Sequence, residues 1–415
     1  MNVTIEPGLL CGSVTPPPSK SHVHRLLIAA ALAQNPTAEF EQTIIVCPKE
    51  NADIAATIRC MEAMNCVVNR KGDQLQVISS ADYSAHATLD CGESGSTLRF
   101  FLPICAACNF PDVHFTLTGR GRLPQRPNGP LLDEMRKNGA MIMVDEEARK
   151  RGEELPVTIL PGMNPGEYDL PGNISSQYFT GLLFALPLLS GESTLRYTSP
   201  LESMPYVNMT LSVLRQFGIE VVPIENGWRI PGKQRYCSPG QVEAEGDWSS
   251  AAFWETANLL GSAVTQQGLR ADSVQGDRRI GRLLQRIGGE IDVTDTPDLM
   301  PVLSIAAAAT LGKTEISGAA RLRIKESDRL SAMAQVIRAL GGKAEEKADG
   351  LIIQGGELQG GVIDGMNDHR VVMSAAIAAT VCRNPVTILG AEAADKSYPG
   401  FFEDFARLGG KIHVG

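Results

Sequence analysis

The segment TPDLMPVLSIAAAATL, residues 296–311, begins with a short polar turn and continues as an almost unbroken apolar run from Leu299 to Leu311. A helix without a polar face must be covered by other parts of the protein on most of its sides. The segment therefore predicts a helix inside a layered fold.

The same plan occurs five more times along the chain: a turn of Gly, Ser or charged residues opens directly into an apolar, helix-like run. A repeat of this kind indicates a fold built from several copies of one structural unit. The other turns and runs are 18–21 before 26–33, 92–97 before 98–108, 172–177 before 178–189, 246–250 before 251–260, and 367–370 before 371–381.

A second series of six segments alternates with the first and has apolar residues at spacings of three and four, which predicts amphipathic helices. Five of these segments are followed by a glycine where a helix C-cap belongs: Gly139, Gly218, Gly288, Gly341 and Gly409. The segments are 52–64, 131–138, 207–217, 279–287, 330–340 and 401–408.

The repeating unit is too long for a solenoid and holds two helices and several short strands. The markers Lys20, Ser94, Ile174, Asp247, Pro297 and Arg370 lie 74, 80, 73, 50 and 73 residues apart. We expect buried helices enclosed by sheets and outer helices, with the six units arranged as two lobes of three.

Size and composition fit an ordinary globular chain, because 415 residues with 43% hydrophobic and 20% charged side chains allow two or three cores. The net charge of -9 argues against broad binding of nucleic acid or anionic membranes. The longest apolar stretch, residues 179–189, is shorter than the roughly 20 residues of a membrane span, and the N-terminus lacks a secretion signal. We expect a cytoplasmic protein.

Nine cysteines are scattered through apolar segments, which favours reduced core thiols over a disulfide framework. Cys105 and Cys108 form a CxxC pair, but no second pair or ligand histidine lies nearby in the sequence. Packing in the core is a better explanation than a metal or redox site. We expect no metal.

Several turns of the first series carry cations or hydroxyls where a helix would begin. Helix N-termini expose unpaired N–H groups and a partial positive charge, so they bind anions. Simple capping by Ser or Asp would explain one such motif. Several of them in one acidic protein favour phosphate or carboxylate binding: Lys20 with Arg25, Ser175 with Ser176, and His369 with Arg370.

Two further stretches are basic. Residues 119–127 carry three arginines between prolines and glycines, and the prolines restrain the geometry of Arg126. Residues 321–329 alternate charges before an amphipathic helix, so Lys325 and Arg329 could bind anions while Glu326 transfers a proton. A solvated loop and a salt-bridged surface are the respective alternatives. No Walker A, dinucleotide-binding or zinc-protease motif occurs.

Taken together, these motifs resemble the enolpyruvyl transferase family of EPSP (5-enolpyruvylshikimate-3-phosphate) synthases, in the order of that family and over nearly the entire chain. The motifs are 20–25 (Lys-Ser-x-x-x-Arg), 92–99, 122–127, 175–177, 205–206, 246–247, 297–298, 325–329 (Lys-Glu-Ser-Asp-Arg), 367–370 and 396–399.

The resemblance implies an α/β fold: a two-lobed, inside-out α/β barrel in which each lobe has three βαβαββ repeats with buried helices and outer sheets. One lobe would be discontinuous, residues 1–19 plus 234–415, and would carry Asp298, Glu326, Arg370 and Lys396. The other, residues 20–233, would carry Lys20, Arg25, Arg126 and Ser175.

The reaction that the resemblance implies is transfer of the enolpyruvyl group of phosphoenolpyruvate to the 5-hydroxyl of shikimate 3-phosphate, with release of phosphate and without a cofactor. The residues implied for shikimate 3-phosphate are Lys20, Ser21, Arg25, Ser175, Ser176, Gln177, Ser203, Asp298 and Lys325. Those implied for phosphoenolpyruvate are Lys20, Gly95, Arg126, Gln177, Arg329, Arg370 and Lys396.

Addition of a hydroxyl across an enol ether needs one acid and one base at the same centre. We assign Glu326 to the methylene carbon, Asp298 to the hydroxyl, and Lys20 to assistance at the hydroxyl or the phosphate. Glu93 and Arg321 depart from the family pattern, because asparagine is common at both positions.

Two other functions are compatible with the fold. The sister enzyme that acts on UDP-N-acetylglucosamine has a cysteine five residues before the loop arginine, where this chain has Gly121. A non-catalytic anion-binding scaffold would not need both proton-transfer carboxylates. We therefore expect a monomeric enzyme with two small-molecule substrates and no nucleic-acid or membrane partner.

Overall fold

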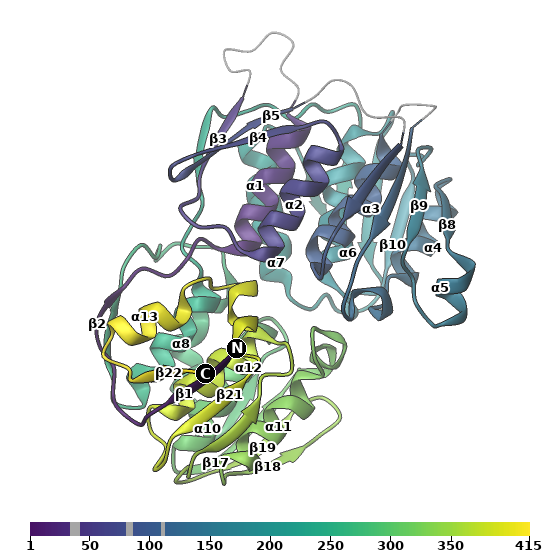
Figure 1. Ribbon diagram of the computed structural model, residues 1–415. Coiled ribbons are helices and arrows are strands. Elements are labelled where there is room, and N and C mark those ends of the chain that lie inside the picture. Colours follow the sequence, from purple (N-terminus) through teal and green to yellow (C-terminus); the bar gives the residue numbers. More distant parts are fainter. Residues whose placement is uncertain (34–41, 80–85, 109–112) are drawn as a thin grey trace. The chain divides into compact units, whose positions relative to one another are not determined.

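The computed structural model describes residues 1–33, 42–79, 86–108 and 113–415, which form two units (Figure 1). Unit 1 joins Met1–Ser19 to Glu245–Gly415, and unit 2 is Lys20–Ala244. The fold class is α/β, as expected. The described strands of each unit form three separate sheets rather than one closed ring, so neither unit is a barrel of continuously paired strands.

Two repeats of unit 2 follow the order strand, helix, strand, helix, strand, strand. In both sheets the first two strands are parallel and the last two form an antiparallel hairpin, which gives the spatial order first, second, fourth, third. One repeat is β6 (His86–Asp90), α3 (Gly95–Ala107), β7 (His114–Thr118), α4 (Gly129–Lys137), β8 (Met141–Val144) and β9 (Val157–Leu160), with α5 (Glu146–Lys150) inserted before β9. The other is β10 (Glu167–Leu170), α6 (Ser176–Ala185), β11 (Ser193–Tyr197), α7 (Met204–Gln216), β12 (Val222–Ile224) and β13 (Gly227–Ile230).

The third repeat of unit 2 takes its first strand from the far end of the unit. Its later elements are α1 (Lys20–Leu32), β3 (Thr43–Val46), α2 (Ala52–Ala63), β4 (Val67–Lys71) and β5 (Gln74–Ile78). The first strand is β14 (Gln241–Glu243), which pairs in parallel with β3. The chain therefore leaves unit 2 after residue 244, and the boundary expected at 233 lies eleven residues too early.

Unit 1 has two complete repeats with the same spatial order. One is β16 (Glu290–Asp292), α10 (Met300–Ala309), β17 (Gly312–Ser317), α11 (Arg329–Ala339), β18 (Lys343–Glu346) and β19 (Leu351–Gly355). The other is β20 (Gly361–Asp364), α12 (His369–Ala379), β21 (Val386–Leu389), α13 (Phe401–Arg407) and β22 (Ile412–Val414), and β1 (Asn2–Ile5) supplies its last strand.

The remaining repeat of unit 1 is shorter than expected. It has β2 (Cys11–Val14), α8 (Trp248–Leu259), β15 (Ala263–Gln266) and α9 (Ile280–Leu284), and its sheet holds only the parallel pair β2 and β15. Among the described residues, this repeat has no counterpart of the hairpin of the other repeats, so the expected βαβαββ unit is here shortened to βαβα. The short spacing of 50 residues between Asp247 and Pro297 belongs to this repeat.

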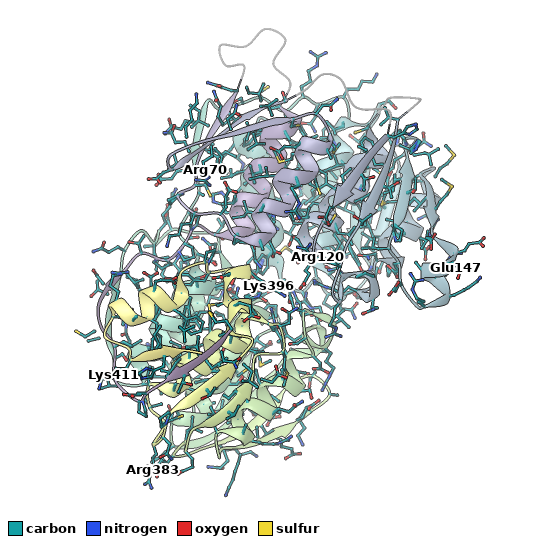
Figure 2. All side chains as sticks on the ribbon, in the orientation of Figure 1. Arg70, Arg120, Glu147, Arg383, Lys396 and Lys411 are labelled. Carbon is teal, nitrogen blue, oxygen red and sulfur yellow. The ribbon has the colours of Figure 1, made fainter. Side chains whose placement is uncertain are left out.

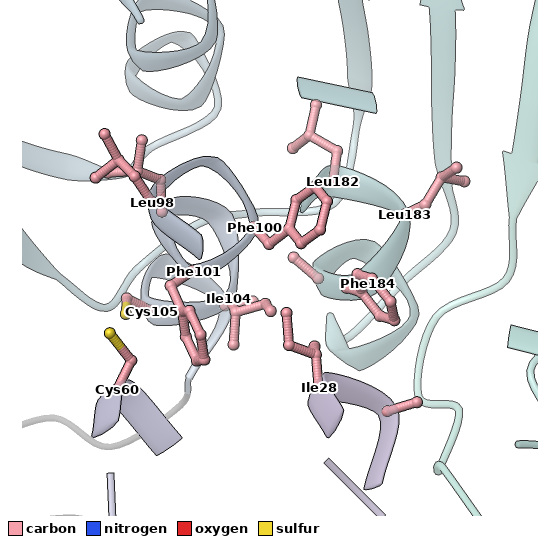
Figure 3. Packing of buried hydrophobic residues seen from close by; sticks show 14 of the residues in the cluster. Ile28, Cys60, Leu98, Phe100, Phe101, Ile104, Cys105, Leu182, Leu183 and Phe184 are labelled. Carbon is pink, nitrogen blue, oxygen red and sulfur yellow. The ribbon is translucent and has the colours of Figure 1, made fainter. Parts of the chain in front are cut away.

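The six apolar runs are the buried helices α1, α3, α6, α8, α10 and α12, and they form the cores of the two units. In α3, every residue except Ser96 is buried. Figure 3 shows side chains of α1, α3 and α6 meeting in the core of unit 2, where the rings of Phe100 and Phe184 lie 6.2 Å apart. Burial on all sides explains why these helices lack a polar face.

The amphipathic series forms the second set of helices, and several end at glycines with positive φ, such as Gly139 at 92° and Gly341 at 84°. A residue with a Cβ would be strained in this conformation. All nine cysteines have free thiols, and Cys105 and Cys108 are buried in the core as expected. In the described part of the chain, no helix is both long and apolar enough to cross a membrane.

Candidate active site

Unit 2 buries an arginine without a carboxylate beside it. Arg25 on α1 is 2% exposed, and its guanidinium donates to Thr210 Oγ1 (2.8 Å) and to the carbonyls of Ser21 (2.6 Å) and Tyr206 (3.0 Å). Burial lowers the pKa of Arg25 to about 9. Among the described residues, no carboxylate lies within ion-pair distance of it, so an anion would find an uncompensated positive charge here.

The α6 N-terminus lies in the same unit and presents hydroxyls and N–H groups. Ser175 is the N-cap, and its Oγ accepts from Gln177 N at 3.3 Å. Ser176 begins the helix, and no acidic residue occurs in its first turn. This combination suits a phosphate or carboxylate group.

Gln177 is held by two neighbours. Its Oε1 accepts from Arg99 Nη1 at 2.6 Å, and its Nε2 donates to Ser96 Oγ at 2.8 Å. Arg99 also donates to Asn128 Oδ1 and to the carbonyl of Pro127. Arg99 therefore joins α3, α6 and the segment after the basic loop, a role that the sequence analysis did not assign to it.

The basic loop and the N-terminus of α3 meet at Gly95. Arg126 is 5% exposed, and a Cβ placed on Gly95 would lie 2.7 Å from its Nη1 and 2.9 Å from its Cζ. Gly95 is therefore needed for the close approach of this guanidinium, rather than only for the approach of a ligand to the backbone.

Lys20 is the first residue of α1, and its Nζ lies 2.9 Å from Asp53 Oδ2 on α2. Both side chains are partly buried, with 16% and 18% of their surface exposed. Asp53 was not among the predicted residues. It fixes the position of the ammonium group.

Ser203 precedes α7 in a left-handed conformation with φ 58° and ψ 38°, and it is buried. Such a conformation is uncommon for a residue other than glycine and is often found at functional sites. Ser21 lies in the first turn of α1 and orients Arg25 through its carbonyl. The predicted residues Lys20, Ser21, Arg25, Gly95, Arg126, Ser175, Ser176, Gln177 and Ser203 thus all belong to unit 2.

Unit 1 is organised around a second buried arginine, which has three carboxylate partners. Arg329 is 2% exposed. Its Nε lies 2.8 Å from Asp368 Oδ2, its Nη1 2.9 Å from Asp298 Oδ1, and its Nη2 2.9 Å from Glu326 Oε2. Although burial opposes the charge, the three carboxylates raise the pKa of Arg329.

Both predicted proton-transfer groups are therefore attached to one guanidinium. The side chains of Asp298 and Glu326 are 22% and 18% exposed, whereas Asp368 is fully buried as the N-cap of α12. Asp368 also accepts from Ser327 Oγ at 2.9 Å. Asp368 was not predicted, and it holds Arg329 in place while the other two carboxylates remain accessible.

Asp298 belongs to the 3-10 turn η4 (Pro297–Leu299), and its charge state is set by three cations. Burial acts to raise its pKa, but Arg370, Lys325 and Arg329 outweigh burial and hold the pKa well below the usual range. The carboxylate is thus ionised and able to accept a proton. In the absence of a bound substrate anion, the three cations keep its basicity low.

Arg370 on α12 faces Asp298 and the first turn of α8. Its Nη2 lies 3.6 Å from Asp298 Oδ2, and its Nη1 donates to the carbonyl of Ser249 at 3.0 Å. Lys325 follows the turn η5 (Ala320–Ile324). Lys396, labelled in Figure 2, ends the turn η6 (Ala391–Lys396). Its Nζ donates to the carbonyl of Asn367 at 2.9 Å.

Glu93 and Arg321, the two residues that depart from the family pattern, each contact a neighbouring segment of the chain. A Cβ on Gly121 would lie 2.9 Å from Glu93 Cδ, so the Glu93 side chain packs against the basic loop, in which Arg120 is labelled in Figure 2. Arg321 donates to the carbonyl of Thr294 at 2.9 Å. The Glu93 side chain therefore lies beside the loop backbone at Gly121.

The chain matches the family model of EPSP synthase (3-phosphoshikimate 1-carboxyvinyltransferase) over residues 5–296 and 287–405. The chain belongs to the EPSP synthase family. Two relatives named 3-phosphoshikimate 1-carboxyvinyltransferase, from Clostridium novyi and Clostridium kluyveri, are 37% and 39% identical to it, and each alignment covers 99% of this chain and 98% of the relative.

The fold agrees with this family. EPSP synthase from Acinetobacter baumannii superposes with a TM-score of 0.80 at 26% identity, and all of both chains is covered. The resemblance noted from the motifs is therefore confirmed over the full length of the chain, and EPSP synthases provide the reference for its chemistry.

Proposed function

We propose that this protein transfers the enolpyruvyl group of phosphoenolpyruvate to the 5-hydroxyl of shikimate 3-phosphate, and so forms EPSP and phosphate. The family membership supports the reaction. The observation that carries the chemistry is the pair of accessible carboxylates, Asp298 and Glu326, held 2.9 Å from the same buried Arg329.

In the first step, the hydroxyl oxygen bonds to C2 of phosphoenolpyruvate. Asp298, as the carboxylate, takes the hydroxyl proton, and Glu326, as the protonated acid, gives its proton to the methylene carbon C3, so a tetrahedral intermediate forms. In the second step, Glu326 takes a proton back from C3 while the bond between C2 and the phosphate oxygen breaks. Phosphate leaves with the proton that Asp298 received, and both carboxyl groups regain their starting states.

Binding of the anionic substrates would raise the pKa of Asp298. A carboxylate or phosphate that binds near Arg370 or Lys325 neutralises part of the positive charge that now lowers the pKa of Asp298. Asp298 therefore becomes a stronger base only when the anionic substrate is present. Lys20 assists at the hydroxyl or at the leaving phosphate, and Arg329 orients both carboxylates.

For shikimate 3-phosphate we propose that Arg25 and Ser21 bind the carboxylate, and that Ser175, Ser176 and Lys325 bind the phosphate. Gln177, Ser203, Lys20 and Asp298 complete this set. Phosphoenolpyruvate is proposed to contact Lys20, Gly95, Arg126, Gln177, Arg329, Arg370 and Lys396. The uncompensated charge of Arg25 supports the first assignment, and the Gly95–Arg126 contact supports the second.

A phosphate-release assay tests the function. Release should require both phosphoenolpyruvate and shikimate 3-phosphate. Release with UDP-N-acetylglucosamine, and none with shikimate 3-phosphate, would favour the sister enzyme, and no release with either would favour a non-catalytic scaffold. We further propose a cytoplasmic monomer, which light scattering of the purified protein and fractionation of the cell test directly.

A further inference from the structure

Asp277 is a buried carboxyl group in unit 1 for which the proposed reaction has no use. It lies on the 3-10 turn η3 (Gly276–Arg279) and is 2% exposed. Its Oδ2 accepts from Ser249 Oγ, whereas its Oδ1 is buried without a hydrogen-bond partner among the described residues. An ionised carboxylate with one bare oxygen is costly to bury, so this geometry favours the neutral acid.

The charges around Asp277 come from three elements. Asp298 on η4 and Asp247, the N-cap of α8, disfavour its ionisation, and Arg370 on α12 favours it. On its own element, Arg278 donates to the carbonyl of Ala271 and Arg279 pairs with Asp295. Burial first, and Asp298 second, raise the pKa of Asp277 to about 7.

Asp277 is linked to Arg370 through one residue. The Oγ of Ser249 donates to Asp277, and the carbonyl of Ser249 accepts from Arg370 Nη1 at 3.0 Å. Arg370 already faces the carboxylate of Asp298 at 3.6 Å. A second negative charge in this neighbourhood would compete with an anionic substrate for the same guanidinium.

We propose that Asp277 is a neutral carboxylic acid in the working enzyme and acts on Arg370 as a pH-dependent positioning residue. While it is neutral, the positive charge of Arg370 stays available to the substrate anion. When it ionises, it weakens binding of that anion. The inference rests on the proposed function, because phosphoenolpyruvate is the anion assigned to Arg370.

The test uses Asp277→Asn, which keeps the shape of the side chain and fixes it as neutral. The ratio of the wild-type KM for phosphoenolpyruvate to that of the variant should be close to one at about pH 6 and rise to about threefold to tenfold by about pH 8.5. Because the ratio is taken at each pH, ionisation of the substrate itself cancels. The control is Asp272→Asn, which removes an exposed carboxylate paired with Arg270, and its ratio should stay near one.

A second measurement does not need activity. In full-length protein labelled with ¹³C at the aspartate carboxyls, the resonance that disappears in Asp277→Asn should titrate near pH 7. Ser249→Ala removes a hydrogen bond that lowers this pKa and keeps the carbonyl that Arg370 uses, so it should move the midpoint upward.

The outcomes separate the two proposals. A midpoint below about pH 5, or a KM ratio that does not change with pH, would overturn the role of Asp277. If phosphate release fails with shikimate 3-phosphate in the wild type, the proposed function is wrong, and the carboxyl titration still decides whether Asp277 is a neutral acid.

Discussion

The substitution Gly95→Ala tests how the N-terminus of α3 and the basic loop cooperate. The new Cβ would lie 2.7 Å from Arg126 Nη1, 2.9 Å from Cζ and 3.0 Å from Nη2. To reach an ordinary contact of about 3.4 Å, the guanidinium must withdraw by roughly 0.7 Å. It is the flexible end of a side chain, so we expect the fold to survive while the guanidinium changes place.

The displacement is large enough to matter for an anion. A hydrogen bond of about 2.9 Å that lengthens by roughly 0.7 Å lies beyond hydrogen-bonding distance. Loss of one hydrogen bond to a charged group costs about 1.5–3 kcal/mol, so the KM for phosphoenolpyruvate should rise about tenfold to a hundredfold. Affinity for shikimate 3-phosphate should change little, because the nearest atoms to the new Cβ belong to Arg126 and not to Arg25 or Ser175, which are assigned to that substrate.

The assay is steady-state phosphate release at saturating shikimate 3-phosphate, with titration calorimetry for shikimate 3-phosphate itself. Gly129→Ala is a matched control in the same unit, because its Cβ would meet only Glu154 Oε1, at 3.8 Å. An unchanged KM in Gly95→Ala would refute the reasoning, and so would an equal loss of affinity for both substrates.

Three further results are expected. Glu326→Gln should lower kcat by about 10²-fold to 10⁴-fold with little change in shikimate 3-phosphate affinity, as measured by single-turnover kinetics and calorimetry; normal solvent deuterium incorporation at the methylene carbon would contradict its role. Burial lowers the pKa of His24 to about 3, so the neutral imidazole contributes fully to the free energy of unfolding above pH 6.5, and this contribution is lost as the pH falls toward 3. In urea unfolding, His24→Gln should therefore lose less stability across this pH window than the wild type. Equal losses would argue against a buried neutral imidazole. Phosphate release should be unchanged by excess EDTA, and inhibition that added Mg²⁺ or Zn²⁺ reverses would show that a metal is required.

The repeats were predictable because each apolar run has to be buried, whatever its partners are. The parts of the fold that differ from the prediction lie where the sequence carries little periodic signal. β14 has three residues and is defined by its pairing with β3, about 200 residues earlier in the chain, so the unit boundary could not be placed from local pattern. The sequence signals the two-stranded sheet of β2 and β15 only through the short spacing of 50 residues between Asp247 and Pro297.

The candidate site can be predicted from the sequence only to the level of motifs. Cations and hydroxyls at helix N-termini indicate anion binding through local geometry alone, and this is the signal that predicts Lys20, Arg25 and Ser175 as binding residues. Which side chains pair with one another depends on how helices of different repeats pack. The pairing of Arg329 with Asp368, 39 residues away, and of Ser249 with Asp277, 28 residues away, has no signal in the local sequence.

Two of the buried arginines, Arg25 and Arg329, suggest a division of labour. Among the described residues, Arg25 has hydrogen bonds only to hydroxyls and carbonyls, so its charge is left for a ligand, and burial lowers its pKa. Arg329 is surrounded by three carboxylates, so most of its charge is already neutralised where phosphoenolpyruvate is proposed to contact it, and its removal would leave Asp298, Glu326 and Asp368 to repel one another. We therefore expect Arg25 chiefly to bind a ligand and Arg329 chiefly to position Asp298 and Glu326, to which the proposed mechanism assigns proton transfer. On this reasoning Arg25→Gln should chiefly weaken shikimate 3-phosphate binding, whereas Arg329→Gln should also raise the pKa values of its partner carboxyls and shift the acidic limb of the pH–rate profile upward. An identical pH profile for wild type and Arg329→Gln would mean that Arg329 only binds substrate, as its sequence motif alone suggests.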